Sequence, residues 1–334
     1  MSRPLMLAAA QLGPVGRKEA RASVVRRMLR LIEDAALMGC RLVVFPEMAL
    51  TTFFPRWHIE DGEEVARFFE REMPGLETRA LFDASRHLGV GFYLGYCEET
   101  VDDRGDVHRY NTSILVEDGR IVGKYRKVHL PGNAVYDPEL KLQHLEPWYF
   151  EPGDLGFPVF PAFGTKVGML ICNDRRWPEP WRVLGLQGVE LVCLGFNSPA
   201  QLPDAPEQNA LRTLHHLVPM QAAAYQNGTW IVASAKAGRE DGCDMMAQSC
   251  VIAPSGEVVA ISSTLGDELV PYRIDLEMTE PYKRFFDFGT YRRPECYRLI
   301  VERKGVGEPL APAASPVPAR DGADAADAAM DGAA

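Results

Sequence analysis

The feature that most constrains the fold is an alternation of short apolar runs with amphipathic helical segments, from residue 5 to residue 303. Residues 17–38 place Val24, Met28 and Leu31 three or four positions apart, which predicts a helix with one apolar face. Residues 42–45 form a continuous apolar run, as expected for a strand covered on both faces. The pattern predicts a layered α/β sandwich that contains mixed sheets.

The same patterns predict the other elements. Asp118-Gly119 lies between two apolar runs, which indicates a hairpin. Further helices are expected over residues 61–72, 76–88, 209–226 and 276–288, with another starting near Pro178. Further strands are expected over residues 5–11, 89–99, 112–117, 120–130, 166–171, 190–196, 229–236, 247–253, 257–263 and 268–276.

Composition separates one folded body from a tail. No linker interrupts residues 1–303, so we expect one domain there, and residues 304–334 are rich in Ala, Pro and Asp. Such a segment buries too little apolar surface to offset its ordering entropy, which predicts disorder. The net charge of −10 argues against nucleic-acid binding. No apolar run approaches the roughly 18 residues of a membrane span, so no membrane contact is expected.

The cysteines point to chemistry rather than to crosslinks. Seven occur at irregular spacing without a C-x-x-C motif, which favours reduced thiols and a cytoplasmic protein. Cys172 ends the apolar run 166–171 and precedes an expected helix, where free N–H groups favour a thiolate with a pKa of about 3.5–7.5. A thiolate is a nucleophile for a carbonyl carbon. The alternative is a small buried hydrophobic residue.

Two further residues gain interest only in combination with Cys172. Glu47 ends the apolar run LVVFPE, where partial burial would raise its pKa toward that of a useful base. Lys127 lies in KYRKVHLP. Taken singly, Glu47 would be a solvated loop residue and Lys127 a solvated surface residue.

The segments FPE, GKYRKVHLPG and ICNDRRWPE occur in this order and resemble the three signature segments of the nitrilase (carbon–nitrogen hydrolase) superfamily. The segments ALTTFFPRWH, YFEPGDLGFPVF and HHLVPMQAAAYQNG resemble the N-carbamoyl-D-amino-acid amidohydrolase branch. The resemblance covers residues 5–303. It implies a four-layer α-β-β-α sandwich with two mixed β-sheets and a homo-oligomer, either a dimer or a tetramer.

The resemblance also implies catalytic roles. Glu47 is expected to be the general base, Lys127 to stabilise the oxyanion and Cys172 to be the nucleophile. The backbone N–H of Asn173 is expected to complete the oxyanion hole. Glu146 matches the second glutamate of the family, which hydrogen-bonds near the lysine. Without the resemblance, Glu146 would be taken for a salt-bridged loop residue.

Substrate contacts follow from the same resemblance. Arg175 and Arg176 are expected near the amino-acid carboxylate, one binding it and the other structural, because a guanidinium fork matches a carboxylate. Asn197 and Ser198 are expected to contact substrate, although members of the branch carry threonine at the second position. Residues 199–213 fit the branch poorly and lie where side-chain specificity would be set.

Three histidines, His129, His144 and His215, match residues that surround the site in this branch, although lone histidines are more often scaffold. Their spacing fits no metal-ligand pattern, and the implied mechanism needs neither metal nor cofactor. In the C-terminal segment 280–303, aromatic residues such as Tyr282, Phe285, Phe286, Phe288 and Tyr291 either pack across a subunit interface or cover their own sheet.

The expected reaction is hydrolysis of an N-carbamoyl-D-amino acid to the amino acid, ammonia and carbon dioxide through a cysteine thioester. Three alternatives stay open. A β-ureidopropionase or aliphatic amidase would share the three catalytic residues but not the paired arginines. An acyl transferase would use the same thioester with an amine acceptor. A binding protein without catalysis would not need Glu47, Lys127 and Cys172 together.

Overall fold

The computed structural model describes residues 2–309. Contacts divide the described residues into two compact units, with the boundary between residues 290 and 291. The boundary expected after residue 303 therefore falls inside the second unit, which contains the short helix α9 (Arg298–Glu302). From residue 310 on, the tail that is predicted to be disordered lies outside the described residues.

The first unit contains two large mixed sheets. The first sheet has the order β15-β1-β2-β4-β5-β6, with β3 paired to β4. Its strands are β1 (Pro4–Gln11), β2 (Leu42–Val44), β3 (Phe69–Glu70), β4 (Gly91–Val101), β5 (Val107–Glu117), β6 (Arg120–Arg126) and β15 (Glu268–Asp275). Strands β1, β2 and β4 are parallel, and β15, β5 and β6 add antiparallel edges.

The second sheet has the order β14-β13-β10-β9-β8-β7, and a separate hairpin is formed by β11 and β12. Its parallel centre is β8, β9 and β10. The strands are β7 (Val159–Ala162), β8 (Thr165–Ile171), β9 (Leu191–Phe196), β10 (Trp230–Ala235), β11 (Ala237–Glu240), β12 (Cys243–Met246), β13 (Cys250–Ile252) and β14 (Val258–Ile261).

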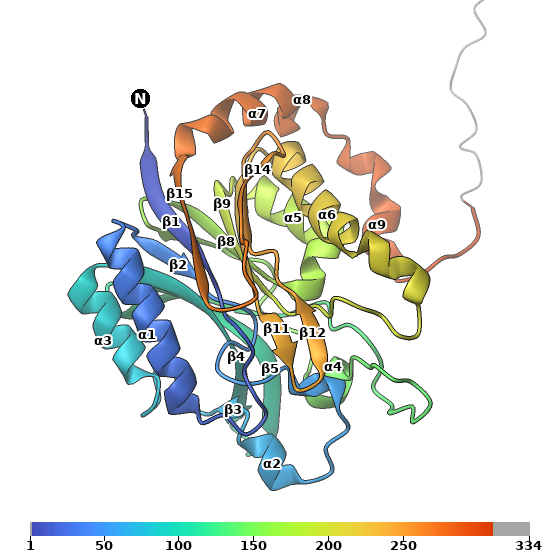
Figure 1. Ribbon diagram of the computed structural model, residues 1–334. Helices are drawn as coiled ribbons and strands as arrows, with labels where there is room; N and C mark the ends of the chain where they lie inside the picture. Colours follow the sequence, from blue (N-terminus) through green and yellow to red (C-terminus); the bar gives the residue numbers. More distant parts are fainter. Residues whose placement is uncertain (1, 310–334) are drawn as a thin grey trace, which may run out of the picture. The chain divides into compact units, whose positions relative to one another are not determined.

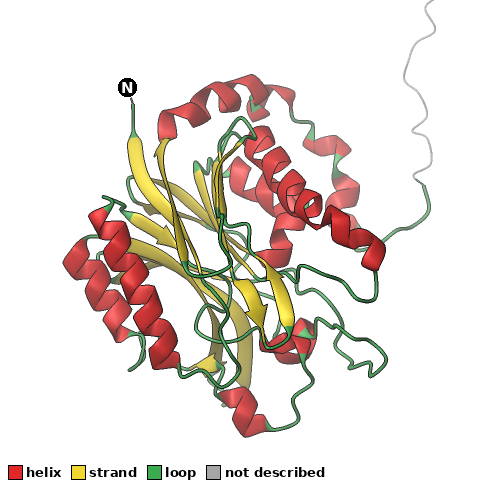
Figure 2. Ribbon diagram, in the orientation of Figure 1, coloured by secondary structure: helices red, strands yellow, loops and turns green. Residues whose placement is uncertain are grey.

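Helices cover the outer faces of both sheets (Figures 1 and 2). Helices α1 (Arg21–Leu37) and α3 (Arg79–Leu88) lie on the first sheet. Helices α5 (Pro178–Leu186) and α6 (Arg212–Asn227) lie on the second. The four-layer α-β-β-α sandwich with two mixed sheets is therefore confirmed. Shorter helices are α2 (Gly62–Ala66), α4 (Glu146–Tyr149), α7 (Thr279–Phe286) and α8 (Phe288–Tyr291).

Alternation along the strands explains the layers. In β2, Leu42 and Val44 join the core between the two sheets, whereas Val43 joins the core under α1 and α3. In β4, Tyr93 faces the second sheet and Phe92 faces the helices. Because strand side chains point to opposite faces in turn, a continuous apolar run supplies both cores at once.

Two local predictions have different outcomes. Asp118 and Gly119 have positive φ values of 50° and 68° and join β5 to β6, as a two-residue hairpin turn requires. The helix expected over residues 61–72 is wrong beyond α2. Phe68 packs in the aromatic cluster around Phe54, with ring centroids 4.5 Å apart, and Phe69 pairs with β4 instead. Tertiary packing overrides the helical spacing there.

The aromatic residues near the C-terminus cover their own subunit in part. Tyr282 and Phe286 on α7 pack against Tyr225 of α6, with ring centroids 6.0 and 5.0 Å apart. Arg182 of α5 lies over the ring of Phe288. Phe285, in contrast, is 68% exposed. Tyr282, Phe286 and Phe288 therefore pack against the outer helices, whereas Phe285 and Tyr291 are largely exposed.

Candidate active site

The site lies where strands from both sheets end. Glu47 follows β2, Lys127 follows β6 directly, and Cys172 follows β8. The side chains of Glu47 and Lys127 are fully buried, and Cys172 is 6% exposed. Polar groups buried to this degree need partners within the fold. The partners of each group therefore define the site.

The ammonium group of Lys127 joins two glutamates. Lys127 Nζ donates to Glu47 Oε1 at 2.7 Å and to Glu146 Oε1 and Oε2 at 2.8 and 2.7 Å. Glu146, which opens helix α4, is itself fully buried. We call Glu47, Lys127 and Glu146 the Lys127 cluster. The structure thus brings together three of the four residues predicted to be catalytic, in direct contact.

Two asparagines fix the Glu47 carboxylate. Asn111 Nδ2 on β5 donates to Glu47 Oε1 at 2.8 Å and to Glu146 Oε2 at 3.3 Å. The backbone N–H of Asn197 donates to Glu47 Oε2 at 2.9 Å, and its Nδ2 donates to the Glu47 carbonyl at 2.8 Å. Asn197 was predicted to touch substrate, and here its donors hold Glu47. Asn111 was not predicted, because a polar residue inside an apolar strand carries no motif.

Two glycines allow the Glu47 backbone to lie between the sheets. A Cβ atom on Gly95 of β4 would lie 2.7 Å from Glu47 Cα. A Cβ atom on Gly195 of β9 would lie 2.5 Å from Glu47 N. Any side chain at either position would displace Glu47, so the close approach requires glycine.

The nucleophile candidate sits on a strained backbone. Cys172 has φ of 46°, in the left-handed region that non-glycine residues rarely adopt. This conformation costs roughly 1–3 kcal/mol, which the surrounding structure must offset. The thiol donates to the carbonyl oxygen of Asn197 at 3.3 Å. Since Asn197 also holds Glu47, one residue after β9 connects the sulfur to the carboxylate.

The electrostatics correct one expectation from the sequence. Burial raises the pKa of the Cys172 thiol, and the charge of Glu47 raises it further, against the opposite effect of Lys127 and Arg175. The prediction that Cys172 has a lowered pKa is therefore wrong for the enzyme without substrate. The element that follows Cys172 is a short 3-10 turn over Cys172–Arg176, which supplies too small a dipole to compensate.

Within the Lys127 cluster, burial and charge act in opposition. Burial raises the pKa of Glu146 to about 7, although Lys127 opposes the shift. Burial alone would lower the pKa of Lys127, but the two carboxylates outweigh it and raise the pKa. Lys127 is consequently a permanent cation at neutral pH, and Glu146 titrates near neutrality.

The two arginines after Cys172 have different surroundings. Arg175 is fully buried, donates to the Cys172 carbonyl at 2.7 Å and to Ser198 Oγ at 3.0 Å, and stacks on Phe196. Arg176 as a whole residue is exposed to solvent. Its guanidinium group is nevertheless surrounded by protein, and this burial, together with the charge of Arg175, lowers its pKa to about 10. Within residues 2–309, no carboxylate forms an ion pair with either arginine.

A buried aspartate orders the turn next to the nucleophile. Asp174 accepts hydrogen bonds from the Tyr125 hydroxyl at 2.7 Å, the Ile171 N–H at 3.0 Å and the His129 N–H at 3.1 Å. His129 Nδ1 lies 2.8 Å from the same carboxylate. Asn173 Nδ2 donates to the His129 carbonyl at 3.2 Å. His129 and Asn173 therefore lie in the hydrogen-bond network around the turn that carries Cys172. Asp174 was not predicted, because no motif in the sequence marks it.

The other two histidines differ. Burial, then the charge of Lys127, lowers the pKa of His144 to about 4, so this residue is neutral beside the site. His215 on α6 is half-buried, and within residues 2–309 it forms no hydrogen bond with Cys172. Its neighbour His216 is fully buried, and its ring lies 4.5 Å from that of Phe196. The sequence alone could not separate these two adjacent residues.

Neither a metal site nor a membrane-spanning helix occurs among residues 2–309. No group of three or more His, Cys, Asp or Glu side chains in residues 2–309 is arranged to hold a metal ion. Over the same residues, every helix is too short or too polar to cross a membrane. All seven cysteines are free.

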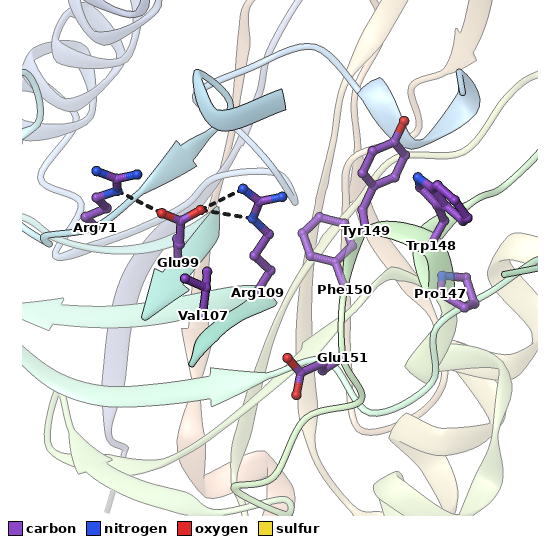
Figure 3. Close-up of a pocket in the computed structure, with 9 residues that line it drawn as sticks. All are labelled: Arg71, Glu99, Val107, Arg109, Pro147, Trp148, Tyr149, Phe150 and Glu151. Carbon is purple, nitrogen blue, oxygen red and sulfur yellow. Dashed lines mark hydrogen bonds and ion pairs between the residues drawn. The ribbon is translucent and has the colours of Figure 1, made fainter. Parts of the chain in front are cut away.

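A hollow of about 530 Å³, lined by neither Cys172 nor the Lys127 cluster, lies beside α4 (Figure 3). Arg71 Nε and Arg109 Nη2 both lie 2.8 Å from the carboxylate of Glu99 in its wall. These charges satisfy one another, unlike those of Arg175 and Arg176. None of the residues predicted from the sequence to form the site lines this hollow.

The chain belongs to the carbon–nitrogen hydrolase family, whose model matches residues 6–284. A nitrilase of Pyrococcus abyssi is 32% identical over 80% of this chain and 90% of the relative. An N-carbamoylputrescine amidase of Arabidopsis thaliana is 27% identical over 83% and 89%. A citrullinase of Francisella tularensis is 30% identical over 81% and 90%.

Solved structures agree on the fold. A carbon-nitrogen hydrolase from Helicobacter pylori G27 superposes with a TM-score of 0.76 over 90% of this chain and 99% of that one, at 24% identity. Nit3 of Saccharomyces cerevisiae, a member of branch 10 of the nitrilase superfamily, gives 0.68 over 87% and 97%, at 20% identity. The family match and the curated relatives accordingly identify the protein as a carbon–nitrogen hydrolase that acts on amides.

Proposed function

We propose that this enzyme hydrolyses N-carbamoyl-D-amino acids to the free amino acid, ammonia and carbon dioxide. The observation that carries the proposal is the pairing of two features. Asn197 connects the Lys127 cluster to Cys172, because its carbonyl oxygen accepts from the thiol and its N–H donates to Glu47. Arg176, four residues beyond the nucleophile, has no carboxylate partner within residues 2–309 and can bind the substrate carboxylate.

In the first half of the reaction, the Cys172 sulfur attacks the ureido carbon while Glu47 takes the thiol proton. The raised pKa of Cys172 makes this base necessary, because the thiol is neutral at rest. Lys127 Nζ and the backbone N–H of Asn173 stabilise the oxyanion. The C–NH2 bond then breaks, and Glu47 returns the proton to the departing ammonia.

In the second half, water attacks the resulting thioester while Glu47 takes a proton from it. The C–S bond breaks, and the proton passes to the sulfur to regenerate the thiol. The N-carboxy amino acid that leaves loses carbon dioxide spontaneously. Glu146 keeps Lys127 in place through both steps, since it contacts Nζ with both oxygens. Division into two steps lowers the barrier that each must cross.

The relatives support a ureido substrate, and the charges support an anionic one. The citrullinase and the N-carbamoylputrescine amidase are both named for compounds with a terminal ureido group. N-carbamoylputrescine carries a cationic amine, however, which the guanidinium groups of Arg175 and Arg176 would repel. An N-carbamoyl amino acid has a carboxylate at that end and would be attracted.

The test is release of ammonia and amino acid from matched D and L N-carbamoyl alanine, with N-carbamoylputrescine and acetamide as further arms. We expect hydrolysis of the D compound and at least tenfold lower kcat/KM for the other three. Preference for N-carbamoylputrescine or for acetamide would overturn the substrate class. Preference for the L compound would overturn the stereochemistry alone.

We also propose that the enzyme is a homo-oligomer and that it is cytoplasmic. Exposed apolar side chains on the outer helices, such as Leu214 at 55%, Val218 at 47% and Leu186 at 48%, support a homo-oligomer, either a dimer or a tetramer. The free cysteines fit a reducing cytoplasm. Sedimentation should show a dimer or larger species, which Val218→Glu dissociates. A monomeric wild-type chain would overturn the assembly.

A further inference from the structure

The residues that follow β9 hold three groups of the site in succession. The carbonyl oxygen of Asn197 accepts from the Cys172 thiol at 3.3 Å. Ser198 Oγ accepts from Arg175 Nη2 at 3.0 Å. The carbonyl oxygen of Pro199 accepts from Arg212 Nε at 3.2 Å and from Nη2 at 2.9 Å. Arg212, the first residue of α6, is therefore attached to the same short segment as the nucleophile.

Arg212 completes a group of three guanidiniums without a counter-charge. Over residues 2–309, no carboxylate lies within ion-pair distance of Arg175, Arg176 or Arg212. The pKa of Arg212 is lowered by burial and by the charge of Arg175. The charge of Arg212 in turn contributes to the lowered pKa of His144 beside Lys127. Since like charges without a counter-charge repel one another, such a group favours an anionic ligand.

The three arginines are not equivalent toward a ligand. Arg175 is fully buried and spends both Nη groups on Cys172 and Ser198. Arg176 is assigned above to the α-carboxylate. Arg212 is half-buried and donates only to one carbonyl oxygen, that of Pro199, which leaves Nη1 available. The α-carboxylate alone leaves the charge of Arg212 unmatched.

Resting on the function proposed above, we infer that Arg212 binds a second acidic group, carried by the substrate side chain, so that the preferred substrates are N-carbamoyl derivatives of acidic amino acids. The residue lies in the segment 199–213, which was expected to set side-chain specificity. A guanidinium binds a carboxylate through charge-assisted hydrogen bonds and gains less from a neutral amide of the same shape. Arg212 is thus a specificity-determining residue.

The experiment compares N-carbamoyl glutamate with its isostere N-carbamoyl glutamine, and N-carbamoyl aspartate with N-carbamoyl asparagine. The free amino acid is quantified by chromatography, because the side-chain amide could also release ammonia. The wild-type ratio of kcat/KM for the acid over the amide should be about ten or more, in line with charge-assisted bonding. Arg212→Gln should bring the ratio down to about one.

The ratio is independent of how much of the variant folds, because both substrates are measured on one sample. Arg26→Gln, an exposed arginine on α1, is the matched control and should keep the wild-type ratio. A wild-type ratio of one or less, or a ratio that Arg212→Gln leaves unchanged, overturns the inference while N-carbamoyl alanine is still hydrolysed. Failure to hydrolyse any N-carbamoyl amino acid would instead overturn the proposed function.

Discussion

Two clusters in this molecule bury a lysine with glutamate, and they behave differently. In the Lys127 cluster, one ammonium serves two carboxylates. We call Arg56, Lys236 and Glu240 the Lys236 cluster, in which one carboxylate serves two cations. All three side chains of the second cluster are at least 95% buried, as in the first. Burial and ion pairing alone therefore do not mark an active site.

The difference lies in how each carboxylate is satisfied. Glu240 also accepts from Thr52 Oγ1 at 3.1 Å and from the N–H groups of Phe53 and Val15 at 2.7 and 3.1 Å. Burial would raise the pKa of Glu240, but Lys236 and Arg56 outweigh it and lower the pKa. The Lys236 cluster thus ties β11 to the segment after Glu47. The Lys127 cluster instead places two carboxylates on one ammonium group, near a thiol.

The largest expected effect separates Cys172 from another buried cysteine. Cys172→Ala should lower kcat by at least about 10⁴-fold, because the covalent route is lost. Cys193→Ala, in the middle of β9, should leave kcat within about twofold and lower the free energy of unfolding by roughly 1–2 kcal/mol. Ammonia release measures kcat, and denaturant unfolding measures the free energy of unfolding, for each variant. Equal losses of kcat in the two variants would contradict the contrast.

The next effect compares the two lysines. Lys127→Met should lower kcat by about 10²–10³-fold, because one oxyanion donor is lost. Lys236→Met should keep kcat per folded molecule within about tenfold and lower the free energy of unfolding by roughly 3–5 kcal/mol, because Glu240 loses a buried partner. A large loss of kcat in well-folded Lys236→Met would erase the distinction between the clusters.

A smaller effect concerns pH. With its pKa raised from 4.5 to about 7, Glu146 binds more protons in the folded state than in the unfolded state between these values. Its contribution to stability is therefore present below about pH 4.5 and is lost as the pH rises through 7. Glu146→Gln should remove this slope from unfolding measured between pH 5 and 8, and should remove an inflection of kcat near pH 7.

Glu240 gives the opposite sign and serves as the matched control. Its lowered pKa means that its stabilisation is present above the unfolded value and is lost as the pH falls through the folded value. Glu240→Gln should therefore leave the slope between pH 5 and 8 unchanged. A slope that survives in Glu146→Gln would show that another group titrates there.

The smallest expected effect comes from Tyr93, whose hydroxyl group is buried between the two sheets. Tyr93 OH donates to the Leu170 carbonyl at 2.9 Å and accepts from Gly195 N–H at 3.1 Å, so it links β8 and β9 below Cys172 and Asn197. Tyr93→Phe should lower the free energy of unfolding by about 1–3 kcal/mol, because a buried N–H loses its partner. Tyr96→Phe, whose ring faces the helices from the same strand, should cost less. Equal costs would contradict this.

The sequence predicted what depends on local pattern. The apolar runs that end at Glu47 and Cys172 placed both residues at strand ends, and Asp118-Gly119 placed the β5–β6 turn. The resemblance added the proposed roles, including that of Glu146, which local pattern alone would have assigned to a loop salt bridge.

What depends on packing between distant segments was missed. Strands β7, β11 and β12 were not predicted, because their residues are short, mixed in polarity and ordered by neighbours. Asp174 and Arg212 become informative only when the sheets bring them beside Cys172 and Pro199. The thiolate expected at Cys172 failed because burial and Glu47, which the strand pattern does not reveal, dominate its pKa.

Stoichiometric alkylation of the wild-type enzyme tests most directly whether the sulfur beside the Lys127 cluster performs the chemistry. Activity and the mass of each cysteine-containing peptide are followed during treatment with limiting iodoacetamide, with and without N-carbamoyl-D-alanine. We predict that activity falls in proportion to carbamidomethylation of Cys172 and that substrate slows both. Full modification of Cys172 with activity retained would contradict the account.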